Sequence, residues 1–158
     1  MTQLTKNPSF ESINVGDELP PFEIGETQET MDAPQVHSRT PQVKGMKPPE
    51  ERKNLHNDVD FAKKSLFGTT ANAGVMTMAY VNQMIEACFP SEAFYNGGTL
   101  TYKGISPFRD GDEVVFTGEV VGKRSENGKN FVDFAIKGID KTGRLVGIAE
   151  ATVAPNTY

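Results

Sequence analysis

The sequence predicts an α+β fold in which a curved antiparallel sheet wraps a long central helix. Two observations carry this prediction. Residues 74–89 are apolar around nearly the whole circumference of a helix, as expected of a buried helix. Residues 99–154 form four segments rich in Val, Ile, Phe and Thr, separated by short turns, as expected of antiparallel strands. The apolar face of such a sheet needs a cover, and this helix is the element apolar enough to provide it.

The N-terminal third is expected to contribute little regular structure. An entry loop precedes one strand around residues 22–27. Residues 31–54 contain four prolines and few large apolar side chains, so we expect an irregular Pro-rich excursion there rather than a helix or a strand. A loop longer than about 15 residues in a compact domain is usually functional or disordered, which makes this excursion a candidate lid. The whole chain, residues 1–158, is expected to form a single domain.

Two helices are predicted between residues 55 and 90. Asp58 is a suitable N-cap for a short helix through Lys64. A longer helix is expected from Gly74 to Phe89, where Pro90 ends it. Because this second helix is apolar all round, we expect it to be buried on all sides.

Four strands are predicted after the helices, joined by turns at Asp110-Gly111, Asn127-Gly128 and 141–143. Alternation along the strands places Phe116 and Phe134 on an inward face and Glu119 on a solvent face. The predicted strands are residues 99–105, 113–124, 130–140 and 145–154.

Composition excludes several classes of protein. The net charge of −5 lacks the basic footprint of a nucleic-acid binder. No apolar run approaches the roughly 18 residues of a membrane span, and the N-terminus lacks the apolar centre of a signal peptide. Cys88 has no second cysteine with which to form an internal disulfide, and His56 has no second ligand at metal-binding spacing. We therefore expect a cytoplasmic protein without a metal.

Several motifs resemble those of a known family. They are N-L-H-N-D at 54–58, F-A at 61–62, F-G at 67–68 and G-V-M at 74–76. Two flanking pieces, F-E-S-I-N-V-G-D-E-L at 10–19 and S-P-F-R-D-G-D at 106–112, also fit. Together they resemble the hydratase motif of the MaoC-like and (R)-specific enoyl-CoA hydratases, which have the hot-dog fold. The resemblance implies addition of water to a 2-enoyl thioester, or the reverse dehydration of a 3-hydroxyacyl thioester.

The resemblance also implies a set of catalytic residues. His56 matches the family histidine, whose imidazole can take and return a proton at neutral pH. Gly74 matches the glycine whose N–H points at the thioester oxygen from the start of the central helix. Five residues before His56, Glu51 occupies the position of the family's aspartate. Two alternatives stay open: Glu51 as a solvated loop charge, and Gly74 as a residue that permits close packing.

Substrate-binding residues are expected around the start of the central helix, namely Asn72, Ala73, Val75 and Met76. No cofactor is expected beyond the coenzyme A carried by an acyl-CoA substrate. In hot-dog folds the acyl site lies between two subunits, which implies a homodimer or higher multiple, with a heterodimer as an alternative.

Two other functions remain open. The chain could be a non-catalytic hot-dog subunit that completes a partner's site. It could also be an acyl-CoA thioesterase, for which the central helix offers Glu86 as its carboxylate.

Overall fold

The computed structural model describes residues 2–36 and 53–155. In chain order its elements are η1 (Phe10–Ser12), β1 (Phe22–Gly25), α1 (Gln28–Val36), α2 (Val59–Lys63), α3 (Gly74–Glu86), α4 (Glu92–Tyr95), β2 (Thr99–Gly104), β3 (Glu113–Glu126), β4 (Lys129–Asp140) and β5 (Leu145–Val153).

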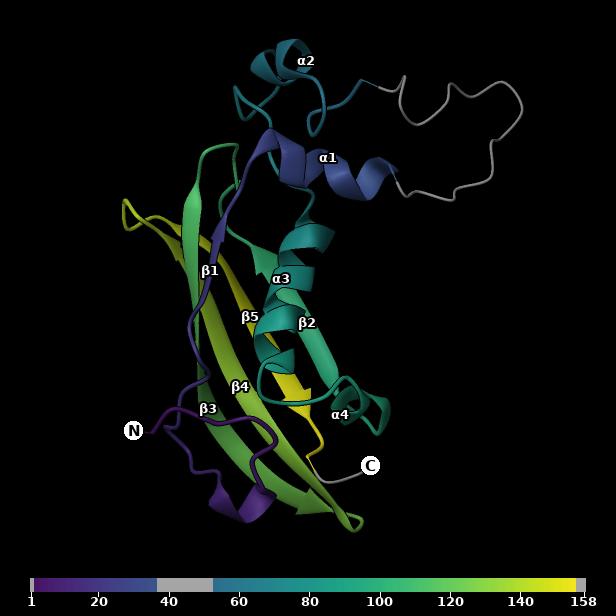
Figure 1. Cartoon of the computed structure of the whole chain (residues 1–158), viewed down its shortest axis with the longest axis vertical. Coiled ribbons are helices and arrows are strands. Elements are labelled where there is room, and N and C mark those ends of the chain that lie inside the picture. The colour runs from purple at the N-terminus through teal and green to yellow at the C-terminus, as the bar shows by residue number, and fades with distance from the viewer. Residues whose placement is uncertain (1, 37–52, 156–158) are drawn as a thin grey trace, which may run out of the picture.

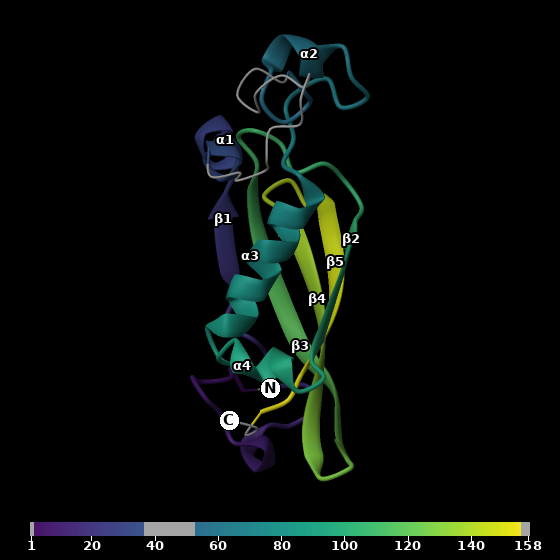
Figure 2. The same ribbon diagram turned by 90° about the vertical axis from the view of Figure 1, so that its right-hand side faces the viewer.

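The strands form one five-stranded sheet in the order β1-β3-β4-β5-β2, with every neighbouring pair antiparallel. The central helix α3 lies against one face of this curved sheet, while α1 and α2 stand at the end where α3 begins (Figures 1 and 2). Val81, Met84 and Ile85 of α3 are fully buried, and Phe116 and Phe134 meet them from the sheet. The predicted fold class, an α+β arrangement of a central helix and an antiparallel sheet, is confirmed.

Each strand predicted from residue 99 onward begins and ends within two residues of the corresponding observed strand, β2 to β5. The β3–β4 hairpin turns at Asn127 and Gly128, which have φ angles of 52° and 76°. Positive φ at both positions is what a two-residue hairpin turn requires, so the Asn-Gly pair determines this connection. The single-turn helices η1 and α4 were not predicted, because three or four residues are too few to show a helical period.

The N-terminal end of α2 is as predicted. Asp58 accepts a hydrogen bond from the Phe61 amide at 2.8 Å. That bond, and next the salt bridge to Lys53, lower the pKa of Asp58.

The central helix begins at Gly74 as predicted, but it ends at Glu86 rather than at Phe89. The expectation of burial on all sides is wrong for the single chain. Its fully buried side chains lie on one face, and Val75 remains 64% exposed. The physical reason is that the sheet covers only the face turned toward it, so apolar side chains on the far face stay open.

The Pro-rich excursion predicted at 31–54 is also wrong in part, because residues 31–36 belong to α1. At the helix start, Thr27 and Thr30 exchange hydrogen bonds between side-chain oxygens and backbone amides. Met31 is buried and anchors the helix to the rest of the protein. Pro34 lies within α1, so a proline that usually ends a helix does not do so here. Residues 37–52 lie outside the described residues, and Glu51 is among them.

A buried carboxylate ties the β4–β5 turn together. Asp140 accepts from the Thr142 hydroxyl at 2.7 Å, from the Thr142 and Arg144 amides at 2.9 Å, and from the Arg144 side chain at 2.8 Å. The Thr142 hydroxyl contributes most to lowering the pKa of Asp140 from its ordinary 3.8 to about 2, and the other donors assist it against the opposing effect of burial. Arg144 also binds Asp112 and the Pro107 carbonyl, which links this turn to the 106–112 loop.

This arrangement predicts a pH-dependent contribution to stability. A carboxyl group whose pKa is lower in the folded state stabilises the fold above its unfolded pKa, and the effect disappears as the pH falls through the folded pKa. Asp140→Asn should therefore lower the melting temperature at pH 7, and the gap to the wild type should close between about pH 4 and pH 2. Thermal unfolding followed by circular dichroism measures both. Asp60→Asn, at a side chain 88% exposed, is the control and should leave the melting temperature unchanged. A gap at pH 2 as large as the gap at pH 7 would contradict this role for Asp140.

In residues 2–36 and 53–155 the two edge strands of the sheet each pair on one side. β1 pairs with β3, and β2 pairs with β5. An edge strand presents unpaired amide and carbonyl groups along its length, which another chain can pair with. The sheet edge and the exposed side of α3 are therefore surfaces that a second domain would cover.

We predict that the purified chain is a homodimer or a higher multiple. Light scattering should give about twice the chain mass of 17.3 kDa, or a larger multiple of it. A monomer at micromolar concentration would contradict a homo-oligomer and favour association with a different chain.

Candidate active site

The turn that carries His56 is held by its own asparagine side chains. The Asn57 side chain accepts from the Asn54 amide at 2.9 Å, and the Asn54 side chain accepts from the His56 amide at 2.7 Å. Short polar side chains that bond to nearby backbone amides stabilise turns of this kind. The asparagines of the N-L-H-N-D motif thus explain why the backbone at His56 has one conformation.

The His56 ring is oriented by a backbone carbonyl. Its Nδ1 lies 2.6 Å from the carbonyl oxygen of Ala71. A carbonyl can only accept a hydrogen bond, so Nδ1 carries the proton in this contact. In the neutral ring Nε2 is then the unprotonated nitrogen, which is the form a general base requires.

The start of α3 lies immediately beyond the residue that orients His56. Ala73 is the N-cap of α3, and its side chain makes no capping hydrogen bond. The first amides of an α-helix have no acceptor within the helix, and their partial positive charge favours an anionic oxygen. In the described part of the chain, the amides of Gly74 and Val75 have no hydrogen-bond acceptor.

Gly74 borders open space. A Cβ built at this position would meet no atom within 4 Å among the described residues. The close-packing alternative for Gly74 therefore finds no support within this chain. The surroundings leave room at the helix start for a ligand or for another chain.

Asn72 lies between the His56 contact and the helix start, and its side chain points into the protein. Its amide nitrogen donates to Glu26, which is 1% exposed. The Thr30 hydroxyl also donates to Glu26, and the Tyr80 hydroxyl lies 3.3 Å and 3.4 Å from its two oxygens. Burial first, and then the neighbouring Glu26, raise the pKa of Tyr80 to about 12, so this hydroxyl keeps its proton at neutral pH and can donate.

A second contact ties the N-terminus of α1 to the histidine turn. The Gln28 side chain donates to the His56 carbonyl at 2.7 Å and to Asp32 at 2.9 Å. The Gln28 amide donates to Asp110 at 3.0 Å. The first turn of α1 thereby joins the His56 turn to the loop before β3.

The loop at 106–112 supports the site from the other side. The Phe108 carbonyl accepts from the Asn72 amide at 2.7 Å, and the Asp112 carbonyl accepts from the Glu26 amide at 2.9 Å. The Phe108 ring packs edge-on against Tyr80 with centroids 6.2 Å apart. The S-P-F-R-D-G-D motif therefore holds both residues of the Glu26–Asn72 pair.

The structure brings most of the predicted site residues together. His56, Asn72, Ala73 and Gly74 lie together at the start of α3, because the His56 ring contacts the carbonyl of Ala71. The start of α3 is at the end of the molecule near α1 and α2 (Figure 1). Val75 and Met76 follow in the first turn of α3, Val75 exposed and Met76 half-buried. Glu51 lies outside the described residues, so its role stays a prediction.

Sequence reasoning missed Glu26, Gln28, Thr30 and Tyr80. For Glu26 a signal existed. Alternation along β1 places residue 26 on the same face as Phe22 and Ile24, the face that packs against the core. A carboxyl group on a core-facing position of a strand is unusual and indicates a specific set of partners.

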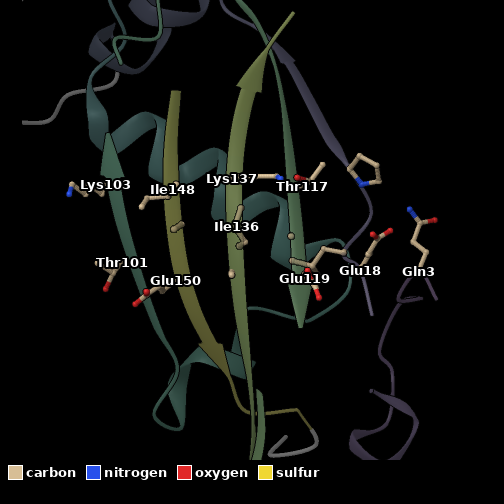
Figure 3. A pocket seen from close by; sticks show the side chains of 15 residues that line it. Gln3, Glu18, Thr101, Lys103, Thr117, Glu119, Ile136, Lys137, Ile148 and Glu150 are labelled. Carbon is tan, nitrogen blue, oxygen red and sulfur yellow. The ribbon is translucent and has the colours of Figure 1, made fainter. Parts of the chain in front are cut away.

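The described residues also form a hollow away from the histidine site. A groove of about 700 Å³ runs over the sheet, and its exposed side chains include Thr117, Glu119 and Lys137. Figure 3 shows these side chains on the strands with α3 behind the sheet. The groove therefore lies on the solvent face predicted for Glu119 and does not contain the histidine site.

No metal centre is found in residues 2–36 and 53–155, because no three His, Cys, Asp or Glu side chains there are arranged to hold an ion. Over the same residues, no helix is long and apolar enough to cross a membrane.

Solved structures with a similar fold include two (R)-hydratases. PhaJ1 from Pseudomonas aeruginosa is 19% identical with a TM-score of 0.72, over 96% of this chain and 88% of that chain. The (R)-hydratase from A. caviae involved in PHA biosynthesis is 20% identical with a TM-score of 0.69, over 90% of this chain and 97% of that chain. The ChsH1-ChsH2 complex from Mycobacterium tuberculosis is 14% identical with a TM-score of 0.69, over 90% of this chain and 98% of that chain. These likenesses establish the hot-dog fold.

Comparison with the curated proteins found no match to the sequence. Comparison with protein families matches residues 51–140 to the MaoC like domain. This range contains the histidine turn, the whole of α3 and the 106–112 loop. Because the match spans more than half of the sequence, the chain belongs to the MaoC-like dehydratase domain family.

Proposed function

We propose that this protein is a hydratase or dehydratase that acts on an acyl thioester, interconverting a 2-enoyl and a 3-hydroxyacyl thioester, with acyl-CoA as the substrate. One observation carries the proposal. The His56 ring is fixed with its Nδ1 on the Ala71 carbonyl, beside a helix start whose first amides have no acceptor in the described part of the chain. Membership of the MaoC-like family supports the same reaction class.

His56 would act as the general base in hydration. Its Nε2 takes a proton from water as the water oxygen bonds to the β-carbon of the enoyl group. The double-bond electrons move to the thioester oxygen, which becomes an enolate. Protonation of the α-carbon then completes the addition of water, and the coenzyme A remains attached throughout.

The N-terminus of α3 would stabilise the enolate oxygen. Amides aimed at the position where negative charge develops lower the barrier, and the positive end of a helix adds to their effect. Gly74 suits this position because its missing side chain leaves the approach to the amide open. Ala73, Val75 and Met76 would line the approach of the acyl group, and Asn72 would contribute only its backbone there, because its side chain is bonded to Glu26.

Glu51 remains the proposed second proton-transfer group. In the described part of the chain the His56 ring contacts the Ala71 carbonyl and no carboxyl group. A carboxyl group supplied by Glu51, five residues before His56, would complete a pair that can deliver the second proton.

The replacement of the family's aspartate by Glu51 favours a second candidate function. The chain would then be a subunit that completes a partner's site, and hydration would need both chains. Two of the similar structures are complexes by their titles, ChsH1-ChsH2 and HadBC. Hydration by the purified chain alone decides between the two functions.

A thioesterase that uses Glu86 fits the geometry less well. Glu86 is the last residue of α3, about 18 Å along the helix axis from Gly74 at 1.5 Å per residue. Its carboxylate accepts from Asn82 at 2.9 Å on an exposed part of the helix. A carboxylate so far from the open helix start cannot act on a thioester held there.

The role of His56 can be separated from its structural contact by His56→Asn. Asparagine can place its amide nitrogen near the position of Nδ1 and keep the bond to Ala71, but it has no Nε2. We expect kcat for enoyl-CoA hydration to fall by about 10²- to 10⁴-fold, as when a general base is lost, with an unchanged melting temperature. Absorbance of the enoyl thioester measures the rate. A folded variant with the wild-type kcat would exclude His56 as the base.

Glu86→Gln is the matched control for that experiment. It should leave hydration of enoyl-CoA unchanged. Loss of acyl-CoA hydrolysis in Glu86→Gln, with no hydration by the wild type, would instead identify a thioesterase.

Gly74→Ala tests the open helix start. Because a Cβ there meets nothing within 4 Å, the variant should fold and melt like the wild type or slightly higher. The methyl group would displace the thioester from the amide, and a displacement of about 1 Å can cost on the order of 100-fold in rate. Hydration kinetics and thermal unfolding measure the two effects. Wild-type kinetics in a stable Gly74→Ala would exclude a substrate bound against this residue.

A further inference from the structure

Glu26 is a buried carboxyl group that the proposed reaction does not use. It follows β1 on the face of Phe22 and Ile24, and it is 1% exposed. A buried carboxyl group destabilises a fold unless hydrogen bonds compensate for its lost hydration. An apolar side chain would match Phe22 and Ile24 without that cost, so packing alone does not explain a carboxyl group here.

The partners of Glu26 are neutral hydrogen-bond donors. Asn72 donates to one oxygen and Thr30 to the other, and Tyr80 lies within reach of both. Among the described residues no Lys, Arg or His forms an ion pair with Glu26. The carboxyl group therefore orients its donors rather than neutralising a positive charge.

Asn72 connects this network to His56. Its side chain is attached to Glu26 and its backbone amide to Phe108, while the preceding Ala71 donates its amide to Leu55 and accepts from His56. The Asn72 side-chain oxygen is buried and has no partner in the described residues. Without Glu26 the amide nitrogen of Asn72 would lose this partner, and of the described residues Tyr80 is the other one whose side chain interacts with it.

We propose that Glu26 is the positioning residue of the site: through Asn72 it fixes the Ala71 carbonyl that orients the His56 ring. Glu26 acts on the backbone segment 71–72 and does not touch the reacting atoms. The expected effect of Glu26 on turnover rests on the proposed function. Its effect on the His56 ring does not depend on any substrate.

The central test is Glu26→Gln, which keeps the size of the side chain but turns an NH₂ group toward one of the donors. Long-range ¹H–¹⁵N NMR of the ring reports which nitrogen carries the proton. A His37→Ala background leaves His56 as the single histidine of the chain. In the wild type we expect Nδ1 to be protonated, and in Glu26→Gln a mixture of the two neutral forms. The kcat should fall about 10- to 100-fold with little change in KM, as when a partner that orients a metal-binding histidine is removed.

Exchanging the acid and amide groups of Glu26 and Asn72 tests whether Glu26 acts on the His56 ring through Asn72. In the double variant Glu26→Gln, Asn72→Asp, the new amide donates to the new carboxylate. The single protonation state of His56 and part of the kcat should return. Failure to recover either would overturn the assignment to this pair.

Asp17→Asn is the matched control, because Asp17 is another buried carboxylate and accepts from the amides of Asn14 and Thr2 rather than from the site. It should lower stability without changing the His56 ring or kcat. An equal effect from Asp17→Asn, or an unchanged ring and kcat in Glu26→Gln, would overturn the proposal.

Two further results stay decisive. If Glu26→Gln does not fold, Asn72→Ala carries the same expectation, and a folded Asn72→Ala with the wild-type ring and kcat would overturn the proposal. If the wild type hydrates no enoyl thioester, the proposed function fails, but the NMR comparison still decides the role of Glu26.

Discussion

The packing of α3 on the inward face of the sheet is the constraint on which the remaining structure depends. Glycines on the inward side of β3 and β4 make room in this layer. A Cβ at Gly118 would lie 2.8 Å from Leu19 and 3.4 Å from Met84, and a Cβ at Gly138 would lie 2.5 Å from the Phe116 ring. Any side chain there would push the helix or Phe116 outward, because protein interiors have no spare volume. The depth at which α3 lies also determines where its first turn meets the histidine turn and the 106–112 loop.

The two ends of α3 are built on different physical principles. Toward its C-terminus, Met84 and Ile85 are held by apolar packing that tolerates small adjustments. At its N-terminus the supports are directional hydrogen bonds among polar groups with little or no exposure to water. Two of these groups, the side-chain oxygens of Gln28 and Asn72, are buried without a partner in the described residues. Buried polar atoms without partners destabilise a fold. The N-terminal end of α3 is therefore less stable than an apolar contact would make it, but its geometry is more closely defined.

The fold could be predicted from the sequence because the patterns that indicate its elements are local. Hairpin turns such as Asn127-Gly128 and caps such as Asp58 act within a few residues, and alternation along the strands defines the inward face. Residues 31–36 were not predicted to be helical because proline usually ends a helix. The Thr27–Thr30 contacts and the burial of Met31 stabilise α1 in spite of Pro34. Of the candidate site, His56 and Gly74 could be read from motifs. Alternation along β1 could have singled out Glu26 as a carboxyl group on the core-facing side, but not its partners, because Asn72 and Tyr80 are distant in sequence and meet it only through the tertiary fold.

The sequence separations across the site bear on the order in which this protein acquires its parts. Glu26 meets Asn72 across 46 residues, and Gln28 meets Asp110 across 82. A contact between distant residues closes a long loop of chain, and the entropy lost in closing that loop slows folding. The β3–β4 hairpin and α3 have no such requirement and can form early. A partly folded chain could therefore have much of its secondary structure while the His56 ring still lacks a fixed orientation. A correctly oriented ring would indicate that the last tertiary contacts have formed.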